Sequence, residues 1–109
     1  MKPLDIKYAD KTLDAFVTSA IHRVAETGTM TYKFKVTASE VKAQTERERL
    51  RAPVIKEFEN YFADHQVEAR YDESVEAFTV TVDLEHVVLT PGQANFLSTA
   101  MQKHQADIN

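Results

Sequence analysis

The chain has 109 residues, enough for one hydrophobic core and too few for two, so we expect a single domain. Hydrophobic residues make up 43% and charged residues 28%, which is ordinary globular usage and argues against a disordered or a membrane protein. No apolar run approaches the roughly 20 residues of a membrane span, and the N-terminus lacks the apolar core of a signal peptide. Because the chain has no cysteine, disulfides and thiolate metal sites are excluded, and we expect a cytoplasmic protein.

The net charge of -4 conceals an uneven distribution along the chain. Residues 1–56 contain 11 Lys and Arg against 7 Asp and Glu, whereas residues 57–109 contain 2 against 10. If the fold keeps these halves apart, the charges can steer a partner or a second subunit toward one side of the molecule.

The chain opens with residues 1–8, which we expect to form a tail, with a short edge segment over the first seven residues as the alternative. Residues 10–26 then predict a helix, with Asp10 or Thr12 as its N-cap and Gly28 as the left-handed residue that ends it. Its apolar side chains recur at helical spacing and form one stripe: Leu13, Phe16, Val17, Ala20, Ile21 and Val24.

Three segments alternate between apolar and polar side chains, as half-buried strands do. They are residues 29–37, residues 67–71 and the most regular, residues 76–84, in which Phe78, Val80, Val82 and Leu84 share one side. The last two are separated by a short polar turn and predict a hairpin. The outer side of the first strand is basic, because it carries Lys33 and Lys35.

Thr37 and Glu40 have the spacing of a capping box, in which each side chain satisfies the other residue's free backbone amide. The polar segment that follows, residues 40–52, is rich in helix formers, but its only sizeable apolar side chains are Val41 and Leu50. Such a helix has little to bury, so we expect it to project, to lie loosely on the domain or to contact a partner.

Two further helices are predicted beyond that segment. The first begins at Pro53, runs to about His65, and carries its apolar side chains on one face: Val54, Phe58, Tyr61 and Phe62. The second begins at Thr90-Pro91-Gly92-Gln93, the clearest helix start in the chain. Its predicted apolar face consists of Ala94, Leu97, Met101 and His104.

Together these elements predict an α+β fold, a single-domain two-layer sandwich with the order α-β-α-α-β-β-α. We expect a three-stranded mixed sheet with helices packed on one face and a polar second face. The first two strands should be parallel if they are adjacent, because helices connect them, and the last two antiparallel.

The candidate site residues are all basic: Arg47, Arg49, Arg51, Lys33 and Lys35. The arginines alternate with Glu46 and Glu48, a pattern that usually belongs to a solvated helix. The alternative is a recognition segment for carboxylates or phosphates, favoured by the scarcity of apolar positions around it.

No pattern in the chain assigns a reaction, so we expect no enzyme, no cofactor and no metal. The four histidines, His22, His65, His86 and His104, lack a recognised ligand spacing. Two glycines are too few for a P-loop or a dinucleotide-binding fingerprint, and no serine lies in a nucleophile elbow.

The function that we expect is that of a non-catalytic interaction protein that binds another macromolecule, most simply a protein, through the arginine-bearing segment. Regulators, adaptors and inhibitors, including those that phages encode, are often small domains of this kind. Self-association into a symmetric homodimer through leftover apolar helix surface is compatible with this function.

Two other functions stay open at this point. From Thr29 onward, the element order resembles that of a type I KH domain, which implies nucleic-acid binding. However, the helix–helix junction reads Leu50-Arg51-Ala52-Pro53 and has no GXXG loop. Alternatively, residues 57–85, with nine acidic and one basic side chain, could mimic a nucleic acid and inhibit a protein that binds one.

Overall fold

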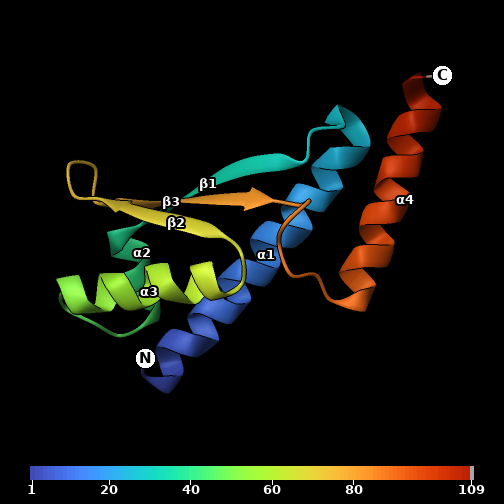
Figure 1. Cartoon of the computed structure of the whole chain (residues 1–109). Helices are drawn as coiled ribbons and strands as arrows, with labels where there is room; N and C mark the ends of the chain where they lie inside the picture. Colours follow the sequence, from blue (N-terminus) through green and yellow to red (C-terminus); the bar gives the residue numbers. More distant parts are fainter. Residues whose placement is uncertain (109) are drawn as a thin grey trace.

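The computed structural model describes residues 1–108 and contains four helices and three strands (Figure 1). Their bounds are α1 Pro3–Thr27, β1 Thr31–Thr37, α2 Ala38–Gln44, α3 Ala52–Asp64, β2 Glu68–Asp72, β3 Ala77–Asp83 and α4 Pro91–Ile108. The predicted α+β class and element order are therefore confirmed.

The strands form one sheet with the order β1-β3-β2, so β3 is central. It pairs antiparallel with both neighbours, for example Phe34 with Val80 on one side and Ala69 with Val80 on the other. The predicted hairpin of β2 and β3 is confirmed, but the sheet is antiparallel throughout and not mixed. The reason is that β3 turns back from β2 and takes the place between β1 and β2, which consequently never pair.

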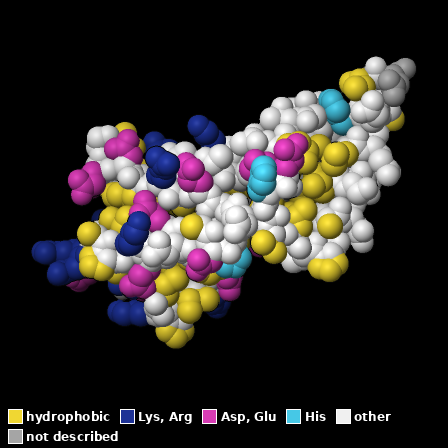
Figure 2. Space-filling model, in the orientation of Figure 1, with side chains coloured by type: hydrophobic (Ala, Val, Ile, Leu, Met, Phe, Trp, Pro, Cys, Tyr) yellow, Lys and Arg dark blue, Asp and Glu magenta, His cyan; other side chains and the backbone are white. Residues whose placement is uncertain are grey.

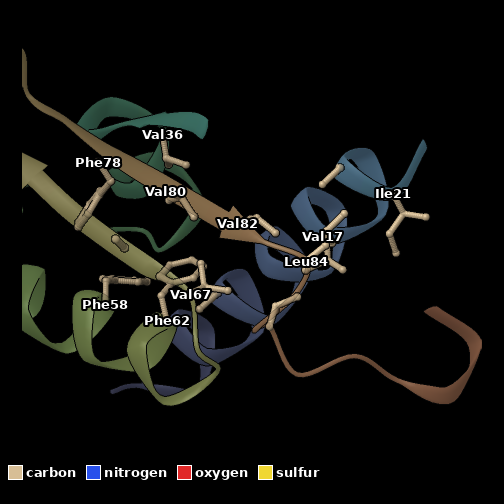
Figure 3. Close-up of a cluster of buried hydrophobic side chains, with 14 of the residues drawn as sticks. Val17, Ile21, Val36, Phe58, Phe62, Val67, Phe78, Val80, Val82 and Leu84 are labelled. Carbon is tan, nitrogen blue, oxygen red and sulfur yellow. The ribbon is translucent and has the colours of Figure 1, made fainter. Parts of the chain in front are cut away.

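The core lies between the inner face of the sheet and the helices α1 and α3 (Figure 3). On β3, Phe78, Val80 and Val82 are at most 3% exposed. From α3, Phe58 and Phe62 pack against them, and α1 contributes Val17 and Ile21 farther along the sheet. The alternation that predicted the strands is thus an alternation between this core and solvent.

Helix α1 begins at Pro3, so the prediction of a tail over residues 1–8 is wrong. The backbone amide of Lys2 donates to Asp5 Oδ2 at 3.0 Å, and Pro3 stands at the first helical position, where its missing amide is no loss. Asp5 and Ala9 are buried. The predicted end is confirmed: Gly28 has a φ of 73° and donates to the carbonyl of Val24 at 2.9 Å.

Helix α2 is much shorter than the predicted polar helix and ends at Gln44. The Thr45 hydroxyl donates to the carbonyl of Val41 at 2.6 Å, and Glu46 takes a left-handed φ of 55°. The amide of Arg47 then donates to the carbonyl of Lys42 at 2.9 Å, which closes the helix end. Residues 45–51 therefore form a loop, here called the arginine loop, which connects α2 to α3.

Helix α4 packs along α1 and stands away from the sheet (Figure 1). Its predicted start is confirmed by both bonds of the capping box, Thr90 N to Gln93 Oε1 at 3.0 Å and Gln93 N to Thr90 Oγ1 at 3.1 Å. The predicted apolar face is only half correct. The helix buries Leu97 and Ala100, whereas Ala94 and Met101 are exposed.

Near its C-terminus, α4 meets the left-handed end of α1. The His104 ring lies against Gly28, where a Cβ atom would come within 2.4 Å of Nε2. Glycine is therefore required here twice, for its positive φ and for the close approach of the ring.

The core contacts of α3 give a first prediction. Replacing Phe58 or Phe62 with alanine should lower the free energy of unfolding by about 3 to 5 kcal/mol, because each change leaves a cavity in the core. Urea melts measure this loss, with Val75→Ala as the control, since Val75 is 55% exposed. A loss below about 1 kcal/mol in both phenylalanine variants would contradict the core described here.

Candidate interaction site

The three arginines predicted to act together are divided by the structure. Arg47 turns inward to the first turn of α1, where Nη2 donates to Asp5 Oδ2 at 2.6 Å and Nε donates to Oδ1 at 3.3 Å. The side chain of Arg47 is 16% exposed and that of Asp5 only 1%. Arg49 and Arg51 are exposed on the arginine loop. Arg47 is thus a structural clamp between two segments 42 residues apart.

Asp5 is the one buried acid in the described part of the chain. Burial by itself raises the pKa of its carboxyl, but the hydrogen bonds from Arg47 and from the Lys2 amide, with the charges of both residues, outweigh it. The net pKa of Asp5 lies below the ordinary 3.8. Asp5 therefore stays ionised at neutral pH and holds Arg47 in place.

Lys33 and Lys35 lie on the outer face of the sheet, as predicted, and the structure separates them from the arginine loop. Across the sheet, Lys33 is in a row with Thr81 and Glu68. The next row consists of Lys35, Thr79 and Arg70. Arg70 Nε approaches Glu68 Oε1 at 3.1 Å, an exposed pair of small energetic value. The unpaired positive charge of this face therefore lies on β1.

The two edges of the sheet differ in how their backbone is satisfied. At the β2 edge, the outward amide of Tyr71 donates to the Glu59 carboxylate of α3 at 3.0 Å. The outward amide of Val67 donates to the carbonyl of Phe62 at 2.9 Å. Helix α3 thus covers this edge by packing along β2 and by bonding the outward amides of Val67 and Tyr71. The outward amide of Ala69 between them has no hydrogen bond within residues 1–108.

The other edge, formed by β1, is open. Leu84 N donates to Met30 O and Ala38 N donates to Glu76 O, both at 2.8 Å, which fixes the even-numbered residues of β1 as those bonded to β3. The backbone groups of its odd-numbered residues point away from the sheet. No hydrogen bond within residues 1–108 reaches the outward amides of Thr31, Lys33 and Lys35. We call this set of groups the β1 edge.

A groove lies beside the β1 edge, between the sheet, α1 and α2. It has a volume of about 270 Å³ and mixed walls: Tyr8, Lys11, Thr12, Ala15, Phe16, Lys35, Val36, Glu40 and Gln44. Farther along, the ring of Phe16 stacks on Phe34 at 4.4 Å, and the Arg23 guanidinium lies 5.5 Å from the Phe34 ring. The groove therefore offers apolar contacts below the edge and lysines around it.

The remaining polar groups of residues 1–108 form no arrangement to which we can assign a reaction. The four histidines lie apart: His22 contacts Phe96, His65 is bonded to the carbonyl of Tyr61, and His104 lies on Gly28. The fourth, His86, contacts an acidic side chain: its Nδ1 is 2.8 Å from Asp83 Oδ2.

Glu85 lies beside that pair, and the three groups could in geometry hold an ion. They are largely exposed, and the bond from His86 together with the Glu85 amide lowers the pKa of Asp83. We assign them no ligand, because Asp83 is already satisfied by these two bonds.

Comparison of the chain with protein-family models, curated proteins and solved structures finds no match. Among residues 1–108, no helix has both the length and the apolar character that crossing a membrane requires.

The sequence pointed to Lys33 and Lys35 but not to the open edge beside them. Lysines on an edge strand are a recognised protection against unwanted strand pairing, so their alternation was a usable signal. This signal identifies an open edge only if β1 is known to be an edge strand. That depends on the strand order, which is set by the insertion of β3 between β1 and β2.

The Asp5–Arg47 clamp predicts a pH-dependent stability. The folded-state pKa of Asp5 is lowered, so its contribution is present above the unfolded-state value near 3.8 and is lost as pH falls through the folded-state pKa. The stability difference between the parent and Asp5→Asn should therefore be largest at neutral pH and shrink below about pH 4. Urea melts between pH 2.5 and 7 measure it.

At neutral pH, Arg47→Ala should lower the free energy of unfolding by about 1.5 to 3 kcal/mol, the usual range for a hydrogen bond to a charged group. Arg49→Ala is the matched control, because Arg49 is exposed on the same loop. Equal losses in both variants would show that the clamp is not a specific interaction.

Proposed function

We propose that this protein is a non-catalytic protein-binding module that takes an extended segment of its partner as a fourth strand on the β1 edge. One observation carries the proposal: α3 packs along the β2 edge and bonds two of its outward amides, whereas the outward amides of Thr31, Lys33 and Lys35 on β1 all lack a partner in the described chain. An added strand satisfies these groups by the same ladder that joins β1 to β3.

The surroundings of the β1 edge favour a particular chemistry in the partner. Side chains of an added strand alternate between the two faces of the sheet. Those on the outer face come next to Lys33 and Lys35, and those on the inner face come over the groove beside Phe16 and Val36. The partner segment should therefore alternate acidic side chains with apolar ones.

A second copy of this chain is a poor occupant of the β1 edge. Pairing two β1 strands about their centres would place the lysines of one copy opposite those of the other. Like charges directly opposite each other destabilise a strand pair. The same lysines that attract an acidic segment thus oppose edge-to-edge association of the protein itself.

This proposal moves the binding site away from the arginine segment that the sequence favoured. Arg47 is held by Asp5, and the helix expected to present the three arginines ends before them. Nucleic-acid binding stays an alternative without a supporting contact: the loop between α2 and α3 has no glycine, and the net charge is -4.

A test begins with a displayed library of random nine-residue peptides selected against the full chain. Enriched peptides should carry acidic residues at alternate positions and bind less tightly as salt concentration rises. Their affinity, measured by fluorescence anisotropy, should fall at least about tenfold for Lys35→Glu, because attraction becomes repulsion. Arg70→Glu is the matched control: it makes the same change of charge in the same row of the sheet but at the β2 edge.

Strand addition is tested separately from charge by Thr31→Pro. This change removes an outward amide that makes no bond to β3, at the first residue of β1, and leaves every charge in place. This variant should fold, as circular dichroism would show, and lose the selected peptides. In the parent, binding should slow hydrogen exchange of the Thr31, Lys33 and Lys35 amides. Selected peptides that bind Thr31→Pro as tightly as they bind the parent would refute strand addition. If no peptide binds but single-stranded RNA binds at about 50 mM salt, the proposal of a protein partner is refuted.

A further inference from the structure

The inner side of the β1 edge differs between its two ends. Tyr32, Phe34 and Val36 point to the inner face of the sheet and pack against the core. At the end next to α2, Val36 is buried and borders the groove. At the end next to Thr31, Tyr32 and Phe34 are only half-buried. A strand added on this edge therefore meets two different surroundings along its inner face.

Arg23 of α1 is held in place at the half-buried end. Its guanidinium lies 5.5 Å from the centre of the Phe34 ring and 5.8 Å from that of the Tyr32 ring, which is cation–π distance. Both rings are fixed by other contacts. Phe34 stacks on Phe16 with 7° between the ring planes, and the Tyr32 hydroxyl lies 2.6 Å from Thr27 Oγ1. The guanidinium is therefore positioned before any partner binds.

The charge of Arg23 has no acidic partner in the described chain. Arg23 is exposed, and none of the ion pairs within residues 1–108 includes it. The strands, by contrast, carry both dark blue and magenta side chains in Figure 2, and Arg70 pairs there with Glu68. A guanidinium can stack on rings and still present its N–H groups to a carboxylate in two parallel hydrogen bonds. Arg23 is thus suited to a carboxylate from outside the described chain.

The groove at the other end is suited to a large apolar side chain. An apolar void of about 10 Å³ adjoins it, and the two hollows share Tyr8, Thr12 and Val36 in their walls. The packing beneath the groove is therefore incomplete, and a bulky side chain gains contacts there as it leaves water. The charged residues of the groove walls are of both signs: Lys11, Lys35 and Glu40.

We propose that the segment added to the β1 edge places one large apolar side chain in the groove and one carboxylate on Arg23. The inference rests on the proposed function, because it requires the added strand. Inner-face side chains of a strand are two residues apart. A side chain opposite Val36 enters the groove, and one opposite Phe34 or Tyr32 comes beside Arg23. The carboxylate therefore stands two or four residues from the apolar anchor.

Arg23 adds position to the charge preference of the β1 edge. Lys33 and Lys35 lie on the outer face and are point charges on flexible stems, so they attract acidic side chains at several positions. The guanidinium of Arg23 is planar and rests on two rings. It accepts a carboxylate only on the inner face, at an even spacing from the anchor. The partner is thus an extended segment with a spaced apolar and acidic pair, in addition to general acidity.

Selection of the displayed nine-residue library against the full chain and two variants tests the inference. Peptides enriched on the parent should carry a large apolar residue with Asp or Glu two or four positions away. Arg23→Glu should remove the preference for that acid. Ala15→Phe should remove the preference for the large apolar residue, because Ala15 is an exposed residue of the groove wall. Ala63→Phe is the control, since Ala63 is exposed on α3 outside the groove.

A charge exchange shows whether the contact with Arg23 is direct. For one enriched peptide, affinity measured by fluorescence anisotropy should fall at least about tenfold when Arg23 becomes Glu or when the spaced acid of the peptide becomes Lys. Combining the two changes should restore binding, because opposite charges then face each other again. Arg70→Glu is the matched control: it makes the same change of charge on β2 and should not restore binding of the lysine peptide.

The outcomes separate this inference from the proposed function. Peptides may slow hydrogen exchange of the β1 edge and yet bind folded Arg23→Glu and Ala15→Phe as tightly as the parent. That result would leave strand addition in place and overturn the inference, as would an acid enriched only at odd spacings from the apolar residue or a charge exchange that restores nothing. If no peptide binds the parent, the proposed function fails, and the inference fails with it.

Discussion

The central position of β3 determines what the rest of the chain has to cover. A three-stranded sheet with β3 in the middle has two faces and two edges, and β3 itself is satisfied on both sides. Helices α1 and α3 cover the inner face, and α3 also covers the β2 edge. Helix α4 packs on α1, and α2 has only seven residues. No helix in the described chain covers the outer face, which carries lysine, threonine, acidic and arginine side chains, and the β1 edge is left to Lys33, Lys35 and threonines.

Local patterns in the sequence predicted each element whose stabilising contacts are local. The capping box at Thr90 and Gln93, the left-handed Gly28 and the alternation in β3 depend on residues a few positions apart, and the structure has all three. Burial of Phe58 and Phe62 was equally accessible, because helical periodicity marks a core-facing side directly.

The errors arose where a distant residue decides the local structure. Asp5 looks like a solvated acid in a tail until Arg47, 42 residues away, supplies its partner. The same bond explains why the polar helix ends early, since it draws Arg47 toward α1 just after Glu46 has turned left-handed. For α4, two overlapping apolar faces fit the sequence, and only the position of α1 decides which one is buried. Strand order has the same character, because it depends on which neighbours β3 finds.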